Sequence, residues 1–152
     1  MPDNTSDLFG KMMAFKQAGE FELISTLIPY AGLVGLELVK ENAGLITVLR
    51  SKPGNIGNTM ISAVHGGVVG ALLEHAGIMH IICECDITRL PKIINLSIDY
   101  LRPCLGTSDT YARGHIIKQG KRVTNIRIEA WQSDQSRPVA AAHAHFLMAQ
   151  ED

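Results

Sequence analysis

The chain has 152 residues, of which 46% are hydrophobic and 19% are charged, and its formal net charge is −1. That length suits one domain with a sizeable core, and the apolar content excludes wholesale disorder. The 14 Lys and Arg nearly balance the 15 Asp and Glu, and only 5% of residues are aromatic. We therefore expect neither a nucleic-acid partner nor attraction to an anionic membrane.

The cysteines and the apolar segments predict a cytoplasmic protein. Cys83 and Cys85 are too close in sequence to close a useful loop, and Cys104 makes the total odd, so a disulfide framework is not expected. The N-terminus lacks the order of a signal peptide. The longest apolar stretch, 68–83, is interrupted by ionisable residues, whereas a membrane span needs roughly 18 uncharged ones. A reducing compartment and no membrane span are the expectation.

The first expected element is an amphipathic helix from about Asp7 to Leu27, where apolar residues recur at helical spacing. Two glycines within it weaken the case for one unbroken helix, and Pro29 ends it. We therefore expect an N-terminal helical segment over 1–28, followed by a single domain over 29–150.

Short elements come next. Two β-prone runs, over 34–40 and 45–50, are separated by a four-residue turn, and this spacing predicts a hairpin. Residues 51–62 are rich in Gly, Asn, Ser and Pro, which predicts a loop.

A buried helix and a run of strands complete the chain. Residues 65–83 have almost no polar position and no alternation, which predicts a helix of about 28 Å that must be covered on nearly all sides. Alternating patterns after it predict strands over 94–100, 110–118, 122–131 and 139–148. Because the strands follow one another without intervening helices, we expect an α+β fold. An antiparallel β-sheet would wrap around one long central helix.

Two features of that helix carry candidate chemistry. His65-Gly66-Gly67 opens it, where backbone N–H groups are unpaired and the helix dipole is positive, which suits an oxyanion hole. Close packing of the helix on a strand explains the glycine pair equally well. Glu74 is the only carboxylate over 51–83, and apolar surroundings would suit it to general-base chemistry near neutral pH. A structural ion pair is the alternative.

The spacing of these features predicts a dimer. Glu74 lies eight residues after Gly66, about 12 Å along one helix, whereas a base must come within about 3.2 Å of the proton that it takes. One helix therefore cannot supply both groups to one carbonyl. Two antiparallel copies across a twofold axis could, so we expect a homodimer or a homotetramer built from two dimers.

These motifs resemble the hotdog-fold acyl-CoA thioesterases of the phenylacetate-degradation type. The resemblance spans Pro29 to Met148 and rests on IPYAGLVGLEL, on HGG followed by an acid nine residues after the His, on IDYLRP and on IIKQGKR. It implies that Glu74 of one subunit is the base or nucleophile and that the Gly66 N–H of the other holds the thioester carbonyl. Gly67 would support the turn. From its place directly before the glycine pair, His65 is expected to fix the turn by hydrogen bonds, with a role as a base as the alternative. No cofactor is implied.

The chain departs from the family pattern at three places, one of which is Glu74 itself, where family members often have Asp. Many relatives carry an Asn six residues before the motif His, where this chain has Thr59, so a one-residue bulge would be needed to deliver Asn58 to the site. Some relatives place a Ser or Thr near the position of Ile93 to hold the water, a role that Asn95 or Ser97 could take if their faces allow.

Charge and residue spacing bear on the binding of coenzyme A and of metal ions. The densest basic cluster is Lys118, Lys121 and Arg122 in the predicted hairpin, which suits the phosphates of CoA, although a solvated turn explains it equally well; Arg102 is a second candidate. The Cys and His spacing near the helix end matches no tetrahedral pattern. His143 and His145 share a strand face without an evident third ligand, so no metal site is expected.

The leading interpretation is a thioesterase that hydrolyses an acyl-CoA to a carboxylic acid and CoA. A hotdog protein that binds acyl-CoA without cleaving it is the first alternative. A hotdog hydratase or dehydratase is the second, and it needs a His and a carboxylate that face one substrate carbon. The sequence leaves open whether Glu74 acts as base or as nucleophile, and which acyl chain is preferred.

Overall fold

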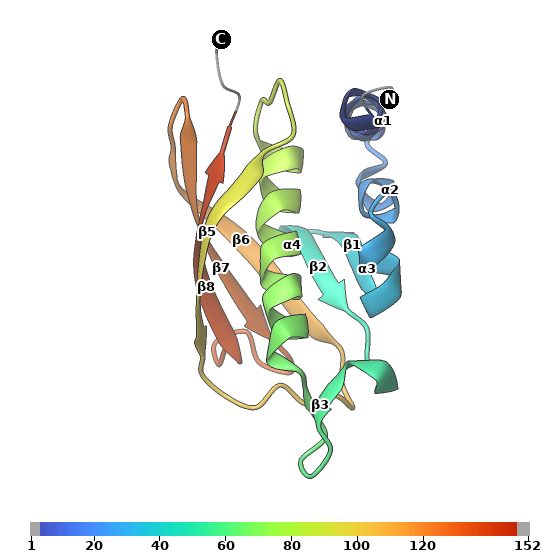
Figure 1. The fold of residues 1–152 in the computed structure, drawn as a ribbon, viewed down its shortest axis with the longest axis vertical. Coiled ribbons are helices and arrows are strands. Elements are labelled where there is room, and N and C mark those ends of the chain that lie inside the picture. The colour runs from blue at the N-terminus through green and yellow to red at the C-terminus, as the bar shows by residue number, and fades with distance from the viewer. Residues whose placement is uncertain (1–3, 149–152) are drawn as a thin grey trace.

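A computed structural model describes residues 4–148, and its main feature is a six-stranded sheet that curves around one long helix (Figure 1). The strands run in the order β1-β2-β6-β7-β8-β5, and each neighbouring pair is antiparallel. The helix, α4 (Gly66–Glu84), contacts every strand of this sheet. The predicted α+β arrangement, with an antiparallel sheet around one central helix, is confirmed.

Three helices precede the sheet, where the sequence predicted one. They are α1 (Asn4–Ala18), α2 (Phe21–Thr26) and α3 (Pro29–Val34). The prediction of one helix from Asp7 to Leu27 is wrong because Gly19 adopts a left-handed φ of 73°, which ends α1. Pro29 starts α3 instead of only ending a helix, since its fixed φ suits the first helical turn.

The N-terminal helices share a core with α4. Met12 of α1 and Ile24 of α2 are buried in one cluster with Met79 and Ile82 of α4. The division into units over 1–28 and 29–150 stays a prediction, and residues 1–3 and 149–150 of those units lie outside the described residues.

The predicted hairpins are confirmed within two residues. β1 (Leu36–Glu41) pairs with β2 (Gly44–Leu49), and β6 (Thr110–Gln119) pairs with β7 (Val123–Trp131). The other two strands of the sheet are β5 (Lys92–Tyr100) and β8 (Ala140–Leu147). Alternate residues of β8, including Ala142, Ala144 and Phe146, are buried on the side of α4, so this face of the strand packs against the helix.

The predicted loop over 51–62 contains short elements that lead into α4. They are a 3₁₀ turn (Pro53–Asn55), β3 (Ile56–Asn58) and, just after the loop, β4 (Ala63–Val64), which pairs with β3. Below the sheet this ladder forms the projecting end of the molecule (Figure 1).

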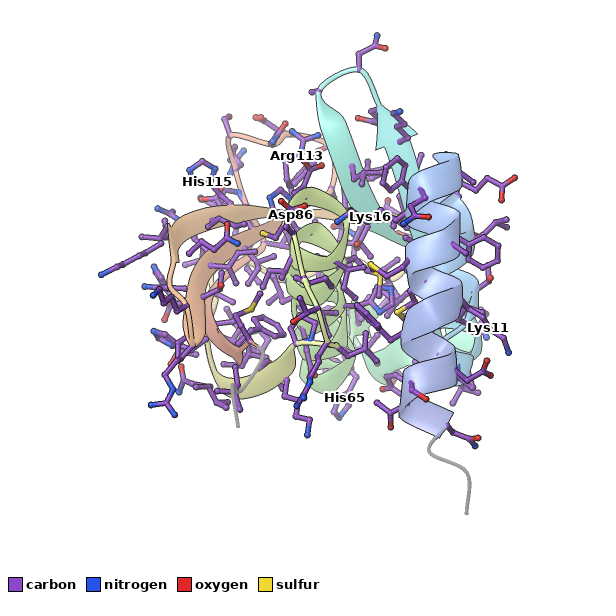
Figure 2. The ribbon with its side chains drawn as sticks, turned by 90° about the horizontal axis from the view of Figure 1, so that it is seen from above. Lys11, Lys16, His65, Asp86, Arg113 and His115 are labelled. Carbon is purple, nitrogen blue, oxygen red and sulfur yellow. The ribbon has the colours of Figure 1, made fainter. Side chains whose placement is uncertain are left out.

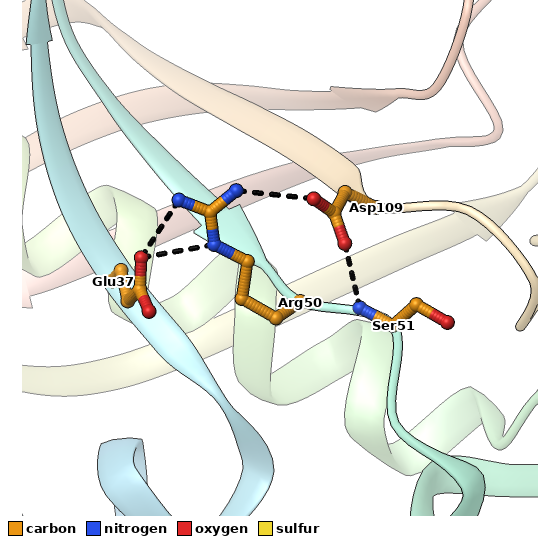
Figure 3. A network of polar contacts seen from close by, with 4 residues as sticks. All are labelled: Glu37, Arg50, Ser51 and Asp109. Carbon is orange, nitrogen blue, oxygen red and sulfur yellow. Dashed lines mark hydrogen bonds and ion pairs between the residues drawn. The ribbon is translucent and has the colours of Figure 1, made fainter.

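A surface ion network holds the start of this loop (Figure 3). Arg50 lies 2.8 Å from Glu37 of β1 and 3.0 Å from Asp109, which precedes β6. Asp109 also accepts a 2.7 Å hydrogen bond from the backbone N–H of Ser51. That N–H, and then Arg50, lower the pKa of the Asp109 carboxyl. The network therefore connects three strands at the point where the chain leaves the sheet.

One stripe of α4 is not covered by the rest of the described chain. Gly67 and Glu74 are exposed and Ala71 and Ile78 are half-buried, and these positions follow one face of the helix. The expectation that α4 is covered on nearly all sides is therefore wrong along this stripe. Within residues 4–148, α4 is the one helix long and apolar enough to cross a membrane, but 61% of that stretch is buried inside the fold.

Candidate active site

The turn that begins α4 leaves one backbone amide free. The Nδ1 atom of His65 accepts a 2.9 Å hydrogen bond from the Gly67 N–H, and the His65 N–H donates to the Asn55 carbonyl at 2.8 Å. Over the residues that the structure describes, the Gly66 N–H has no hydrogen-bond partner. His65 therefore makes two hydrogen bonds within the turn, and the amide available at the positive end of the helix dipole is that of Gly66.

Two residues that the sequence did not mark as part of the site hold this turn. The hydroxyl of Tyr100, at the end of β5, donates a 2.9 Å hydrogen bond to the Gly66 carbonyl. Gly57 of β3 packs so closely that a Cβ atom there would lie 2.6 Å from the His65 Cα. Tyr100 belongs to the IDYLRP motif, which could have suggested it, whereas Gly57 is one of several glycines and gave no separate signal.

Glu74 lies on the uncovered stripe of α4, and its side chain is exposed in the single chain. The expectation that it is buried in apolar surroundings is therefore wrong, because its neighbours along the sequence point to the other faces of the helix. Glu74 nevertheless lines one side of a largely apolar pocket of about 260 Å³ between α4 and the N-terminal helices.

The single chain does not bring Glu74 to the helix start. Glu74 follows Gly66 by eight positions, which corresponds to about 12 Å along α4. In the described part of the chain no hydrogen bond or ion pair joins the two residues. A substrate carbonyl cannot contact both groups of one chain.

The polar residues expected to assist catalysis do not face the start of α4. A bulge does occur next to Asn58, but the Asn58 Oδ1 accepts a 3.0 Å hydrogen bond from the Met60 N–H and so closes its own turn. Asn95 lies opposite His145, at 3.4 Å from its ring, and Ser97 lies opposite His143. These pairs occupy the outer face of the sheet, so neither Asn95 nor Ser97 faces α4.

The predicted basic cluster is exposed at the tip of the β6–β7 hairpin. Lys118 lies near the end of β6, and Lys121 and Arg122 lie in the turn that follows. Figure 1 places this tip at the same end of the molecule as the C-terminal end of α4, opposite the helix start. Arg102, the second candidate, donates to the Pro138 carbonyl at 2.7 Å. The structure therefore keeps the cations of the hairpin away from Gly66 of the same chain.

His75, next to Glu74, is a buried residue that contacts a neighbouring helix. Its Nε2 lies 2.7 Å from the Ser25 hydroxyl of α2, and both side chains are buried. Burial lowers the pKa of His75 to about 4, so the ring is neutral at neutral pH. The contact ties α2 to α4 at the level of the pocket.

Ionisable side chains also gather near the C-terminal end of α4 (Figure 2). Lys16 donates a 2.6 Å hydrogen bond to the Cys85 carbonyl, which satisfies a free acceptor at the helix end. Burial is the main cause that lowers the pKa of His80, and Arg113 and His115 add to the effect. Among residues 4–148 no three His, Cys, Asp or Glu side chains form a group that could hold a metal ion.

Comparison with known proteins gives consistent matches. Residues 62–139 match the sequence profile of the thioesterase superfamily. The medium/long-chain acyl-CoA thioesterase YigI of Salmonella typhimurium is 30% identical over 149 residues, which cover 89% of this chain and 94% of that protein. A crystal structure from Chromobacterium violaceum has a TM-score of 0.76 at 33% identity, covering 94% of this chain and 99% of the other. The Escherichia coli PaaI protein from the phenylacetic acid degradation operon has the same fold, with a TM-score of 0.68 at 17% identity over 95% and 98% of the two chains.

Proposed function

Since the chain belongs to the thioesterase superfamily, as a hotdog-fold acyl-CoA thioesterase of the phenylacetate-degradation type, we propose how its residues hydrolyse the thioester. In this proposal the Gly66 N–H of one chain holds the carbonyl oxygen, and Glu74 of a second chain activates the attacking water. The active unit is a homodimer with two equivalent sites.

The observation that carries the proposal is the free amide of Gly66. The His65 ring accepts a hydrogen bond from the Gly67 N–H, and the Tyr100 hydroxyl donates one to the Gly66 carbonyl. These bonds fix the turn, while the Gly66 N–H stays available as a donor. A donor aimed at a developing oxyanion is worth about 3–4 kcal/mol in comparable hydrolases. Fixing it before the substrate arrives avoids a reorganisation cost during the reaction.

Surfaces left uncovered in the single chain support the dimer. The stripe of α4 that carries Glu74 is open, and beside it the edge strand β5 exposes Ile94 (56%) and Tyr100 (58%). An unpaired edge strand with exposed apolar residues is a surface that proteins normally cover. Two copies with antiparallel α4 helices would cover it and bring each Glu74 toward the helix start of the other chain. The predicted homotetramer would join two such dimers.

The reaction follows from these positions. Glu74 takes a proton from water as the water oxygen bonds to the thioester carbon, and the Gly66 N–H stabilises the resulting oxyanion. The carbon–sulfur bond then breaks, CoA leaves as a thiolate, and Glu74 returns the proton to it. The products are a carboxylic acid and CoA. An acyl-enzyme trapped by hydroxylamine would instead assign direct attack to Glu74.

The basic hairpin fits the same arrangement. Antiparallel helices place the hairpin of one copy at the end where the Gly66 of its partner lies, which supports binding of the CoA phosphates by Lys118, Lys121 and Arg122. Each Ala substitution should raise KM for acyl-CoA by about two- to fivefold. KM for the corresponding N-acetylcysteamine thioester, which lacks the phosphates, should not change; an equal rise for both substrates would contradict this role.

The decisive test is Glu74→Ala with a panel of acyl-CoAs and a thiol-reactive dye that detects released CoA. We expect turnover to fall about 10²- to 10⁴-fold while the dimer persists in size-exclusion chromatography. Glu84→Ala is the matched control, since Glu84 is an exposed Glu on the same helix outside the pocket. Unchanged turnover in Glu74→Ala would refute the assignment. Binding of acyl-CoA by the wild type without release of CoA would favour the non-catalytic alternative.

A further inference from the structure

The pocket beside Glu74 contains surface that the proposed reaction does not use. It has a volume of about 260 Å³, and one wall is formed by α4 while α1 contributes Leu8 and Met12. Building on the proposed function, we infer that this pocket receives the acyl chain of the substrate and that Met12 determines how long a chain fits.

The burial of the lining residues gives the direction of the chain. On α4 the lining runs from Ala71 to Ile82, about 16 Å, and it extends from Glu74 away from the helix start. Tyr30 at one end is 51% exposed, whereas Met12 is 1% exposed and Ile82 is 0% exposed. An acyl chain therefore enters beside Glu74, where its thioester must react, and ends against Met12.

The volume indicates medium-length chains. A cavity of about 150 Å³ holds benzene, so at the same volume per carbon this pocket accommodates about ten carbons. Nearly all of its lining is apolar, so each methylene that enters gains the free energy of leaving water, which corresponds to about fourfold in affinity. Chains beyond that length have no further apolar wall to contact.

The wall of the pocket that α1 provides lies outside the part of the chain that matches the superfamily profile. The match to the thioesterase superfamily covers residues 62–139, which include the α4 wall but neither Leu8 nor Met12. The buried contact of Ser25 with His75 fixes α2 on α4, and α1 packs into the same core. Chain length is therefore selected by a wall outside the residues that match the superfamily profile.

The experiment measures kcat/KM for saturated acyl-CoAs of roughly four to sixteen carbons. We expect a rise of about fourfold per methylene up to about ten carbons and then a plateau. Met12→Ala removes bulk at the closed end and should move the plateau to chains about three carbons longer. Met12→Trp should move it to shorter chains while hydrolysis of the shortest substrates is retained.

The control is Met13→Ala, because Met13 is a methionine of the same helix that does not line the pocket. Leu8→Trp provides a second variant at a half-buried position, should the Met12 variants not fold. A flat chain-length profile, or equal shifts in the Met12 and Met13 variants, would overturn the pocket assignment but leave the proposed function intact.

Calorimetric binding of the same acyl-CoA series, measured in the Glu74→Ala background in which we expect little hydrolysis, decides the inference independently of turnover. A wild type that hydrolyses no acyl-CoA would refute the proposed function. Affinity that still rises with chain length, and that shifts in Met12→Ala but not in Met13→Ala, would nevertheless support the pocket. Affinity independent of chain length would overturn it.

Discussion

The buried contact between Ser25 and His75 should make the stability of the protein depend on pH. The Ser25 hydroxyl and His75 Nε2 are 2.7 Å apart, and the two residues are 2% and 7% exposed. Burial lowers the pKa of His75 from 6.5 to about 4. The neutral ring is therefore part of the folded state, and it holds α2 against the helix that carries Glu74.

The sign and size of the effect follow from linkage. Between pH 6.5 and about 4 the unfolded chain binds a proton at His75 that the folded chain does not bind, so the free energy of unfolding falls as pH falls. Above pH 6.5 the contribution of His75 is complete and constant. At about 1.4 kcal/mol per pH unit, the loss across this interval amounts to about 3 kcal/mol.

Urea unfolding at a series of pH values between about 7 and 4.5 measures this contribution. The reference is His75→Gln, which keeps a polar group beside Ser25 but does not titrate. Subtracting the two curves removes the carboxylates and the other histidines, which both proteins share. We expect the difference to shrink by about 2–3 kcal/mol as pH falls to 4.5. Parallel curves would show that His75 does not titrate in this way.

Two further substitutions test the helix start. Tyr100→Phe removes the 2.9 Å hydrogen bond that fixes the turn and should lower kcat about two- to tenfold with little change in KM. Tyr111→Phe is its control on the outer face of the sheet, and equal losses in both variants would contradict a positioning role. Gly57→Ala places a Cβ 2.6 Å from the His65 Cα and should cost about 1–3 kcal/mol in urea unfolding. A Cβ at Gly54 would meet nothing within 4 Å, so Gly54→Ala is the control and should not show this loss of unfolding free energy. Equal losses in both glycine variants would contradict the close contact at Gly57.

Periodicity alone predicted most of the architecture. Alternation located the strands because each has one face toward α4, as with Ile126 and Ile128 of β7, which are fully buried. The break after α1 was missed because it depends on a left-handed φ at Gly19. The residue type alone does not show which backbone angle a glycine adopts. Residues that act through shape, such as Gly57, carry no chemical signal in a single sequence.

The exposed position of Glu74 shows where reasoning from sequence neighbours fails. An apolar stretch indicates that a helix is covered on most sides, but it does not state which chain provides the cover. In the single chain the cover is missing along the stripe of Gly67, Ala71, Glu74 and Ile78. Three of these residues have small or apolar side chains, which would gain nothing from exposure to water. The same pattern that wrongly predicted burial within the chain is therefore what a surface covered by a second copy requires. We expect the apolar environment of Glu74 to be provided by the second copy in the proposed dimer.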